Sequence, residues 1–172
     1  MRRTQKLFGC LVIIVCFSML NVSAGTMLYR EGDDDVLLTF LRETFPEAVV
    51  YEEPTTPEEW IVIYNPDQDV IGYAVITSPY ADDIVGYGGP VPLLVCIDTR
   101  ERIQSVTLLT HFETIGLMEL LKEGGFMDIW NGRTWEDALD QNVDAVSGAT
   151  MSSQAIIDTL KKRLRMMKSP KK

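Results

Sequence analysis

The chain has 172 residues, of which 46% are hydrophobic and 24% are charged. Once an export segment is set aside, this length leaves one globular domain with a sizeable core, and the composition argues against a repeat or disordered protein. All 25 acidic residues but only six basic ones lie between residues 25 and 160, so the body is acidic and is not suited to bind nucleic acid.

The N-terminal segment has the pattern of an export signal. Arg2, Arg3 and Lys6 precede an apolar run at residues 7–20, and small residues follow at Val22-Ser23-Ala24. Residues 1–24 are therefore predicted to be either a cleaved signal peptide or a retained membrane anchor, since a spanning helix needs about 20 residues. The basic residues would hold the N-terminus inside and place the domain on the extracytoplasmic side. The two alternatives predict a membrane-anchored domain or a soluble periplasmic one.

The first helix is predicted at residues 36–45. Apolar residues recur there at helical spacing, and Pro46 ends the run. The preceding Asp33-Asp34-Asp35 suits a helix start better than a calcium loop, because the later spaced ligands and the glutamate of such a loop do not follow.

The middle of the chain predicts strands. Residues 60–64 and 70–77 are predicted to form a hairpin around the turn at residues 65–67, and residues 91–98 and 102–110 form a second pair around residues 99–101. Residues 78–90 are expected to be a loop. Cys96 lies in the apolar run of residues 91–97 and is interpreted as a buried strand residue without a redox role.

The C-terminal part predicts a short helix at residues 116–122, an irregular segment with Trp130 and Trp135, and a final helix from about residue 153 to 167. Ser152 or Ser153 is expected to cap this helix. The order of elements predicts an α+β domain: an antiparallel meander flanked by N- and C-terminal helices that lie against one side of the sheet. Alternating βαβ units and the glycine-rich dinucleotide fingerprint are missing, which argues against a Rossmann or flavodoxin fold and a nicotinamide ligand.

The tail from Lys161 onward carries seven basic residues. Two interpretations stay open: a solvated end of the last helix, where cations suit the helix dipole, or a contact with anionic lipid headgroups or an acidic partner.

The segment from Asp144 to Thr150, with the sequence Asp-Ala-Val-Ser-Gly-Ala-Thr, places a threonine just before the final helix. An anion bound there would meet unpaired N–H groups and the positive end of the helix dipole. Gly148 and Ala149 leave room beside the threonine, and Asp144 and Ser147 could orient its hydroxyl or only satisfy loop N–H groups. By itself, a threonine at this place is most often a cap.

Two further segments carry candidate site residues. Gly86-Tyr87-Gly88-Gly89-Pro90 could be a flexible entry to a strand, or backbone that approaches a planar ring with Tyr87 as a wall and Gly88 beside it. The second segment is His111-Phe112-Glu113-Thr114-Ile115-Gly116-Leu117. His111 could exchange protons near neutral pH or be a structural residue at a strand end.

Together the three segments resemble the FMN-binding domain family, which includes the G subunit of Rnf and the C subunit of sodium-pumping NADH:quinone reductase. The resemblance runs from about residue 70 to 165. It divides the exported part into residues 25–69, an FMN-binding domain at residues 70–167 and a basic tail at residues 168–172. It implies that FMN is carried as a phosphoester on Thr150, attached by a separate Mg-dependent flavin transferase that uses FAD as donor. It also implies that the flavin relays electrons outside the cytoplasm.

The second segment departs from the family pattern, because Ile115 and Met118 stand where the family usually has Pro and Gly. The details of flavin packing are therefore expected to differ. Glu113 and Thr114 are expected to donate or accept hydrogen bonds at the isoalloxazine ring or its ribityl chain. One His and one Glu do not make a metal site or a hydrolytic triad, so no metal is predicted.

Three functions compete. The first is an electron-transfer subunit of a membrane complex resembling Rnf, which is not an autonomous enzyme. The second is a free-standing exported flavoprotein that feeds an extracellular reductase. The third is a non-redox binding domain in which Thr150 is only a cap.

Overall fold

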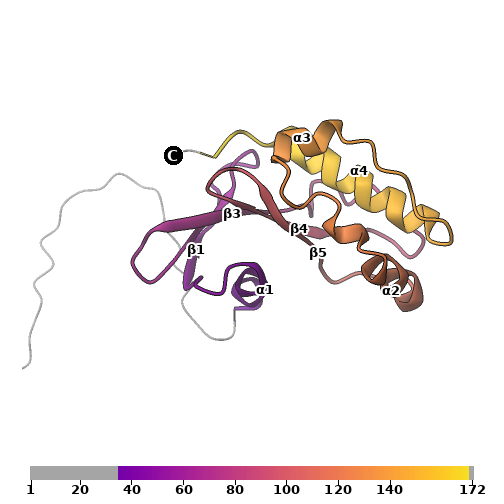
Figure 1. Ribbon diagram of the computed structural model, residues 1–172, viewed down its shortest axis with the longest axis horizontal. Helices are drawn as coiled ribbons and strands as arrows, with labels where there is room; N and C mark the ends of the chain where they lie inside the picture. Colours follow the sequence, from indigo (N-terminus) through magenta and orange to yellow (C-terminus); the bar gives the residue numbers. More distant parts are fainter. Residues whose placement is uncertain (1–34, 171–172) are drawn as a thin grey trace, which may run out of the picture.

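The computed structural model describes residues 35–170 and contains one antiparallel sheet whose five strands lie side by side in chain order (Figure 1). The strands are β1 (Val50–Glu52), β2 (Ile61–Tyr64), β3 (Val70–Ile76), β4 (Leu93–Asp98) and β5 (Ile103–Leu108). Neighbouring strands all pair antiparallel. The predicted α+β fold and the antiparallel meander are therefore confirmed.

Two polar side chains hold the hairpin turns in place. Asn65 Oδ1 accepts hydrogen bonds from the N–H groups of Asp67 at 3.0 Å and Asp69 at 2.8 Å, and so closes the turn between β2 and β3. Asp98 Oδ1 accepts from the N–H groups of Arg100 and Arg102 between β4 and β5. Side chains of this kind favour turns because they replace a backbone acceptor locally.

Helix α1 (Val36–Thr44) starts at Asp35, as the acidic run predicts. The Asp35 side chain accepts hydrogen bonds from the N–H groups of Leu37 and Leu38, which are two of the donors that a helix start leaves unpaired. The predicted export or anchor segment lies outside the described residues. Between residues 35 and 170, no helix is both long and apolar enough to cross a membrane.

Strand β4 is buried on both faces of the sheet. Leu93, Val95 and Ile97 point into the larger core, whereas Leu94 and Cys96 point into a smaller core with Leu38 and Leu41 of α1. The prediction that the helices share one side of the sheet is therefore wrong. The uninterrupted apolar run of β4 is the pattern of a strand with both faces covered, and it could have indicated this arrangement.

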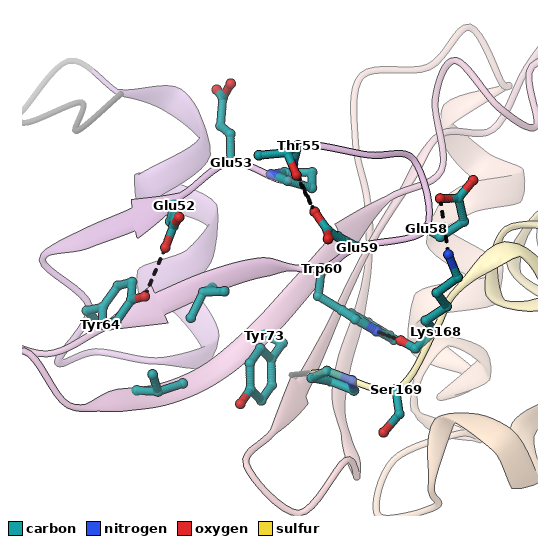
Figure 2. A pocket seen from close by; sticks show the side chains of 14 residues that line it. Glu52, Glu53, Thr55, Glu58, Glu59, Trp60, Tyr64, Tyr73, Lys168 and Ser169 are labelled. Atoms are coloured by element: carbon teal, nitrogen blue, oxygen red, sulfur yellow. Dashed lines mark hydrogen bonds and ion pairs between the residues drawn. The ribbon is translucent and has the colours of Figure 1, made fainter. Parts of the chain in front are cut away.

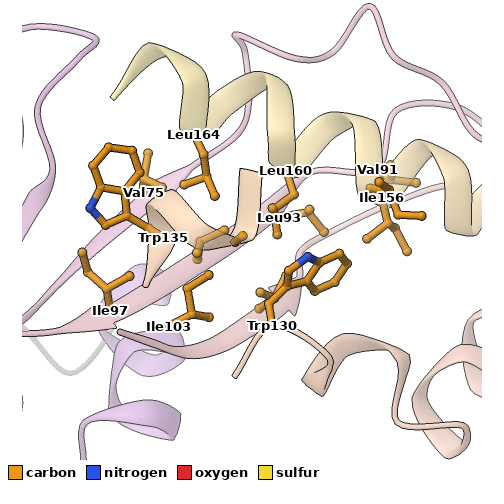
Figure 3. Close-up of a cluster of buried hydrophobic side chains, with 14 of the residues drawn as sticks. Val75, Val91, Leu93, Ile97, Ile103, Trp130, Trp135, Ile156, Leu160 and Leu164 are labelled. Carbon is orange, nitrogen blue, oxygen red and sulfur yellow. The ribbon is translucent and has the colours of Figure 1, made fainter. Parts of the chain in front are cut away.

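The larger core lies between the sheet and the C-terminal helices, on the side opposite α1 (Figures 1 and 3). These helices are α2 (Ile115–Glu123), α3 (Trp135–Asp140) and α4 (Thr150–Met166), with a 3₁₀ turn, η1 (Phe126–Asp128), between the first two. Helix α4 places Ile156, Leu160 and Leu164 on the sheet, all fully buried. This packing fixes the position of both ends of α4.

Three short elements were not predicted from the sequence: β1, η1 and α3. The segment expected to be irregular buries Trp130 and Trp135, whose rings make edge-on contacts with Phe126 and Trp60 at centroid distances of 5.7 and 5.9 Å. Elements of three to six residues present too few periodic positions to be recognised, and tertiary packing stabilises them instead.

Substituting Leu160→Ala should lower the free energy of unfolding by about 2–5 kcal/mol, because it leaves a cavity between α4 and the sheet. Urea unfolding of the purified chain measures this difference. Gln154→Ala, on the exposed side of the same helix, should change stability by less than about 0.5 kcal/mol. Equal losses in the two variants would contradict the packing described for α4.

Cys96 should be inert in the folded chain, because burial raises the pKa of its thiol to about 11. Since the thiolate is the reactive form, iodoacetamide at pH 8 should leave Cys96 unmodified until the chain is unfolded, as peptide mass spectrometry would show. The folded state holds this proton more tightly than the unfolded state does, so stability should fall as the pH rises above about 9. Rapid native labelling of Cys96 would contradict this.

Candidate functional site

Two of the three candidate segments and the first turn of α4, which follows the third, meet at the side chain of Glu113. Its Oε1 accepts a hydrogen bond from the N–H of Gly88 at 2.6 Å, and its Oε2 accepts one from the Ser152 hydroxyl on the first turn of α4. Glu113 is only 5% exposed, and Ser152 is fully buried. One carboxylate therefore joins the glycine-rich segment, the segment before α2 and the start of α4.

Close packing explains two of the glycines. A Cβ atom at Gly86 would lie 2.6 Å from Oε1 of Glu113, and a Cβ atom at Gly88 would lie 2.1 Å from the carbonyl oxygen of Phe112. Both distances are far too short for real atoms. The glycine-rich segment is thus not only a flexible entry to a strand, because its backbone is pressed against the neighbouring segment.

His111 contributes to the shape of this neighbouring segment. It lies beyond the end of β5, and its Nδ1 accepts a hydrogen bond from the Glu113 N–H at 3.1 Å. An imidazole that accepts at Nδ1 in its neutral form carries its proton on Nε2. This contact agrees with the structural interpretation of His111, while a role in proton exchange stays a prediction.

Thr150 is the first residue of α4 and is exposed, with its Oγ1 at 3.4 Å from the carbonyl oxygen of Val146. Helix α4 thus begins three residues before the predicted start. Gly148 lies in the turn before the helix, where its φ of +89° is in the left-handed region that other residues rarely adopt. The N-cap residue is Ala149, which offers no side-chain oxygen to the first N–H groups.

Neither Ser152 nor Ser153 caps α4, so that prediction is wrong. The Ser153 hydroxyl accepts from the N–H of Val146 at 2.9 Å and donates to the carbonyl oxygen of Ala149 at 2.8 Å. It closes the turn that leads into the helix. The Ser152 hydroxyl instead donates a hydrogen bond to Glu113. The two residues are 39 positions apart, so their spacing in the sequence does not reveal this contact.

Large apolar side chains are exposed on the glycine-rich segment, on the segment that leads into α2 and on the helices that follow. Phe112 is 81% exposed, Ile115 is 73% exposed and Tyr87 is 70% exposed. We call the exposed large apolar side chains at or beside the three segments, on α2 and in the first turn of α4 the apolar surface; its members are Val85, Tyr87, Phe112, Ile115, Leu120 and Met151. Exposed groups of this kind mark binding surfaces more often than isolated apolar residues do. Sequence reasoning identified Tyr87 but missed Phe112 and Met151, whose types and spacing gave no signal.

The other predicted site residues belong to the same three segments, and the structure assigns them no specific contact in the site. Asp144, Ser147 and Thr114 are exposed, and Thr114 precedes α2 without a side-chain hydrogen bond at that cap. Gly148 is close to α2, because a Cβ atom there would lie 3.7 Å from Leu120. Of the two departures from the family pattern, Ile115 is exposed on the apolar surface, whereas Met118 is buried in the core.

A cavity of about 530 Å³ lies elsewhere, at the C-terminal end of α4 (Figure 2). Glutamates, aromatic rings and the tail line it, and none of the residues in the three segments does. Lys168 of the tail pairs with Glu58 at 3.6 Å, and its carbonyl oxygen accepts from Trp60 Nε1 at 2.8 Å. Part of the basic tail therefore contacts its own domain.

Other basic residues of α4 also have partners within the domain. Arg163 is buried and donates to the carbonyl oxygens of Ile76 and Pro57 at 2.9 and 2.7 Å, and Lys162 pairs with Asp83. Within residues 35–170, no group of three or more His, Cys, Asp or Glu side chains is placed to hold a metal ion.

Known proteins resemble the chain over most of its length. The sequence profile of the FMN-binding domain matches residues 86–165, which include all three segments. The chain is 32% identical over 134 residues to the G subunit of the ion-translocating oxidoreductase complex of Methanosarcina acetivorans, an alignment that covers 70% of this chain and 69% of the relative. It is 25% identical over 162 residues to the protein of the same name from Cereibacter sphaeroides, with 84% and 72% covered.

The profile match contains the glycine-rich segment, Glu113 and Thr150, which the fold brings to one end of the sheet. The relative from Methanosarcina acetivorans extends the likeness beyond the profile to more than two thirds of both chains. The chain belongs to the FMN-binding domain family.

Proposed function

We propose that the chain is an electron-transfer flavoprotein that carries FMN as a phosphoester on Thr150. The observation that carries this proposal is the position of Thr150: an exposed hydroxyl at the first residue of a helix with no side-chain cap, within a segment matched by the FMN-binding family. The other two hydroxyl groups in the first turn of α4, on Ser152 and Ser153, are buried, and the exposed Ser147 lies before the helix.

The residues present fit an FMN phosphate. The N–H groups at the start of α4 point away from the helix, and the helix dipole adds roughly half a positive charge there. Ala149 supplies no competing side-chain oxygen, so a phosphate on Thr150 would accept from these groups. Gly148 carries no side chain between Thr150 and Leu120 of α2, where a Cβ atom would be in ordinary contact with Leu120 at 3.7 Å.

The residues also fit a planar aromatic ring. The apolar surface offers Tyr87 and Phe112 on adjoining segments, and Ile115 and Met151 nearby on α2 and α4. These side chains would shield one side of a flavin from water, while the tether would hold it near the protein surface. FMN, when bound, supplies the redox chemistry by taking up and releasing electrons. The protein contributes the attachment, the orientation and the local polarity.

Attachment requires a second protein, because the chain provides only the acceptor hydroxyl. In the proposed step, a flavin transferase with FAD as donor forms the bond between Thr150 Oγ1 and the FMN phosphorus. The pyrophosphate bond of FAD breaks, and AMP and the hydroxyl proton leave. Asp144 and Ser147 are exposed on the segment that ends at Thr150, so both are accessible to the transferase.

The partners and the cellular location of the chain are proposed from its sequence and its relatives. The relatives are named as subunits of ion-translocating oxidoreductase complexes, which supports membrane electron-transport subunits as partners of this chain. The predicted export segment at residues 1–24 would place the flavin on the extracytoplasmic side, anchored or in the periplasm. Roles for His111 and Thr114 at the flavin itself belong to the same proposal.

Thr150→Ala should abolish covalent flavin without unfolding the chain. The exposed hydroxyl makes one long contact, so its loss should cost less than about 1 kcal/mol. Intact mass after co-expression with a flavin transferase should show the gain of one FMN, with loss of water, in the wild-type chain only.

Two controls sharpen this measurement. Thr150→Ser keeps a hydroxyl at the same position and should still be loaded, and Thr134→Ala removes a threonine cap from α3 and should be loaded like the wild type. Covalent flavin retained in Thr150→Ala would refute the assigned attachment residue. No gain in the wild-type chain, with the transferase active on another substrate, would favour a non-redox binding domain.

A further inference from the structure

The Glu113 side chain is buried between the glycine-rich segment and the first turn of α4, two parts of the proposed flavin site. Both carboxylate oxygens accept hydrogen bonds from the protein, one from the Gly88 N–H and one from the Ser152 hydroxyl. The space that a side chain would fill at Gly86 is taken by the same carboxylate. Its contacts are therefore with the two segments that flank it.

The two ends of this link lie next to the groups that a flavin would meet. Gly88 follows Tyr87 on the apolar surface, and Ser152 lies two residues after Thr150 in the first turn of α4. The Glu113 backbone is itself held, because its N–H donates to His111 Nδ1 at 3.1 Å. A shift of the carboxylate would thus move Tyr87, a member of the apolar surface, relative to the Thr150 hydroxyl.

We propose that Glu113 is a positioning residue: through Gly88 and Ser152 it holds the glycine-rich segment on the start of α4, and so sets the apolar surface beside Thr150. This inference rests on the proposed function and deepens it, since it assigns a role to a buried group that would otherwise be expected to contact the ring. The carboxylate acts through geometry, because its two oxygens accept from donors on separate segments.

Two substitutions separate geometry from charge. In Glu113→Gln the amide oxygen can accept from Gly88 while the amide nitrogen donates to the Ser152 oxygen, so both links can persist without the charge. Glu113→Ala removes both links and leaves the Gly88 N–H and the Ser152 hydroxyl without their partner. Ser152→Ala removes one link with a minimal change in volume.

The experiment uses the full-length chain and a fixed amount of flavin transferase. The initial rate of covalent loading should fall between about tenfold and a hundredfold in Glu113→Ala, because small misplacements of an acceptor have effects of that size. It should fall less in Ser152→Ala and stay within about threefold of wild type in Glu113→Gln. The loaded alanine variant should also show altered visible circular dichroism and an altered flavin midpoint potential.

A matched control tests whether a general loss of stability, and not the position of Glu113, slows flavin loading. Tyr51→Phe also removes a buried hydrogen bond to a carboxylate, the one from Tyr51 to Asp35 at 2.8 Å, but it does so in the smaller core on the other face of the sheet. It should load at the wild-type rate. Loading that falls equally in Tyr51→Phe and Glu113→Ala would overturn the proposal.

A measurement without flavin makes the inference independent of loading. Amide hydrogen exchange at Gly88, measured by NMR on the unloaded chain, should be faster in Glu113→Ala and unchanged in Glu113→Gln. Wild-type exchange and wild-type loading in Glu113→Ala would overturn the inference while leaving the proposed function standing. A wild-type chain that is never loaded would instead overturn the proposed function, and with it the role of Glu113 in flavin attachment.

Discussion

The packing of α4 on the sheet is the constraint on which the rest of the domain depends. Ile156, Leu160 and Leu164 bury one side of this helix against strands whose other face is covered by α1. A helix fixed along its length by buried side chains cannot slide or rotate without opening the core. Its first residue, Thr150, therefore has a defined position, and 17 residues at about 1.5 Å each separate it by roughly 25 Å from the tail and cavity at the other end.

The candidate site also requires that two loops reach the start of α4. The β2–β3 and β4–β5 hairpins have short, side-chain-stabilised turns, whereas the chain between β3 and β4 and the chain after β5 are longer and reach the start of α4. Loops of this kind have few regular hydrogen bonds of their own. The Glu113 carboxylate links these loops to α4, and the glycines at positions 86 and 88 leave the space that it and the Phe112 carbonyl need.

The sequence predicted the features that depend on neighbouring residues better than those that depend on contacts between residues far apart in the chain. Periodic apolar residues located α1, α2 and the paired strands within a few residues, and the three motifs located the segments of the candidate site. The start of α4 was misplaced because Ser152 and Ser153 have the composition of caps, but their hydroxyls bond to Glu113 and to the preceding turn. Local composition cannot show that a serine is engaged by a residue 39 positions away. The two-sided burial of β4 was predictable in principle, since its apolar run does not alternate.

The same geometry bears on the kind of function that the fold can support. An enzyme that acts on a free substrate usually encloses it in a pocket lined by a few polar groups, whereas Thr150 and the apolar surface are exposed. A redox group tethered there would need no substrate pocket, because its electrons can pass to partners that approach the surface. The acidic body would weaken contacts with anionic surfaces and favour partners with basic rims, with screening beyond about 10 Å. On the proposed function, a buried positioning residue beneath an exposed cofactor reconciles two needs: a fixed attachment point and open access for electron partners.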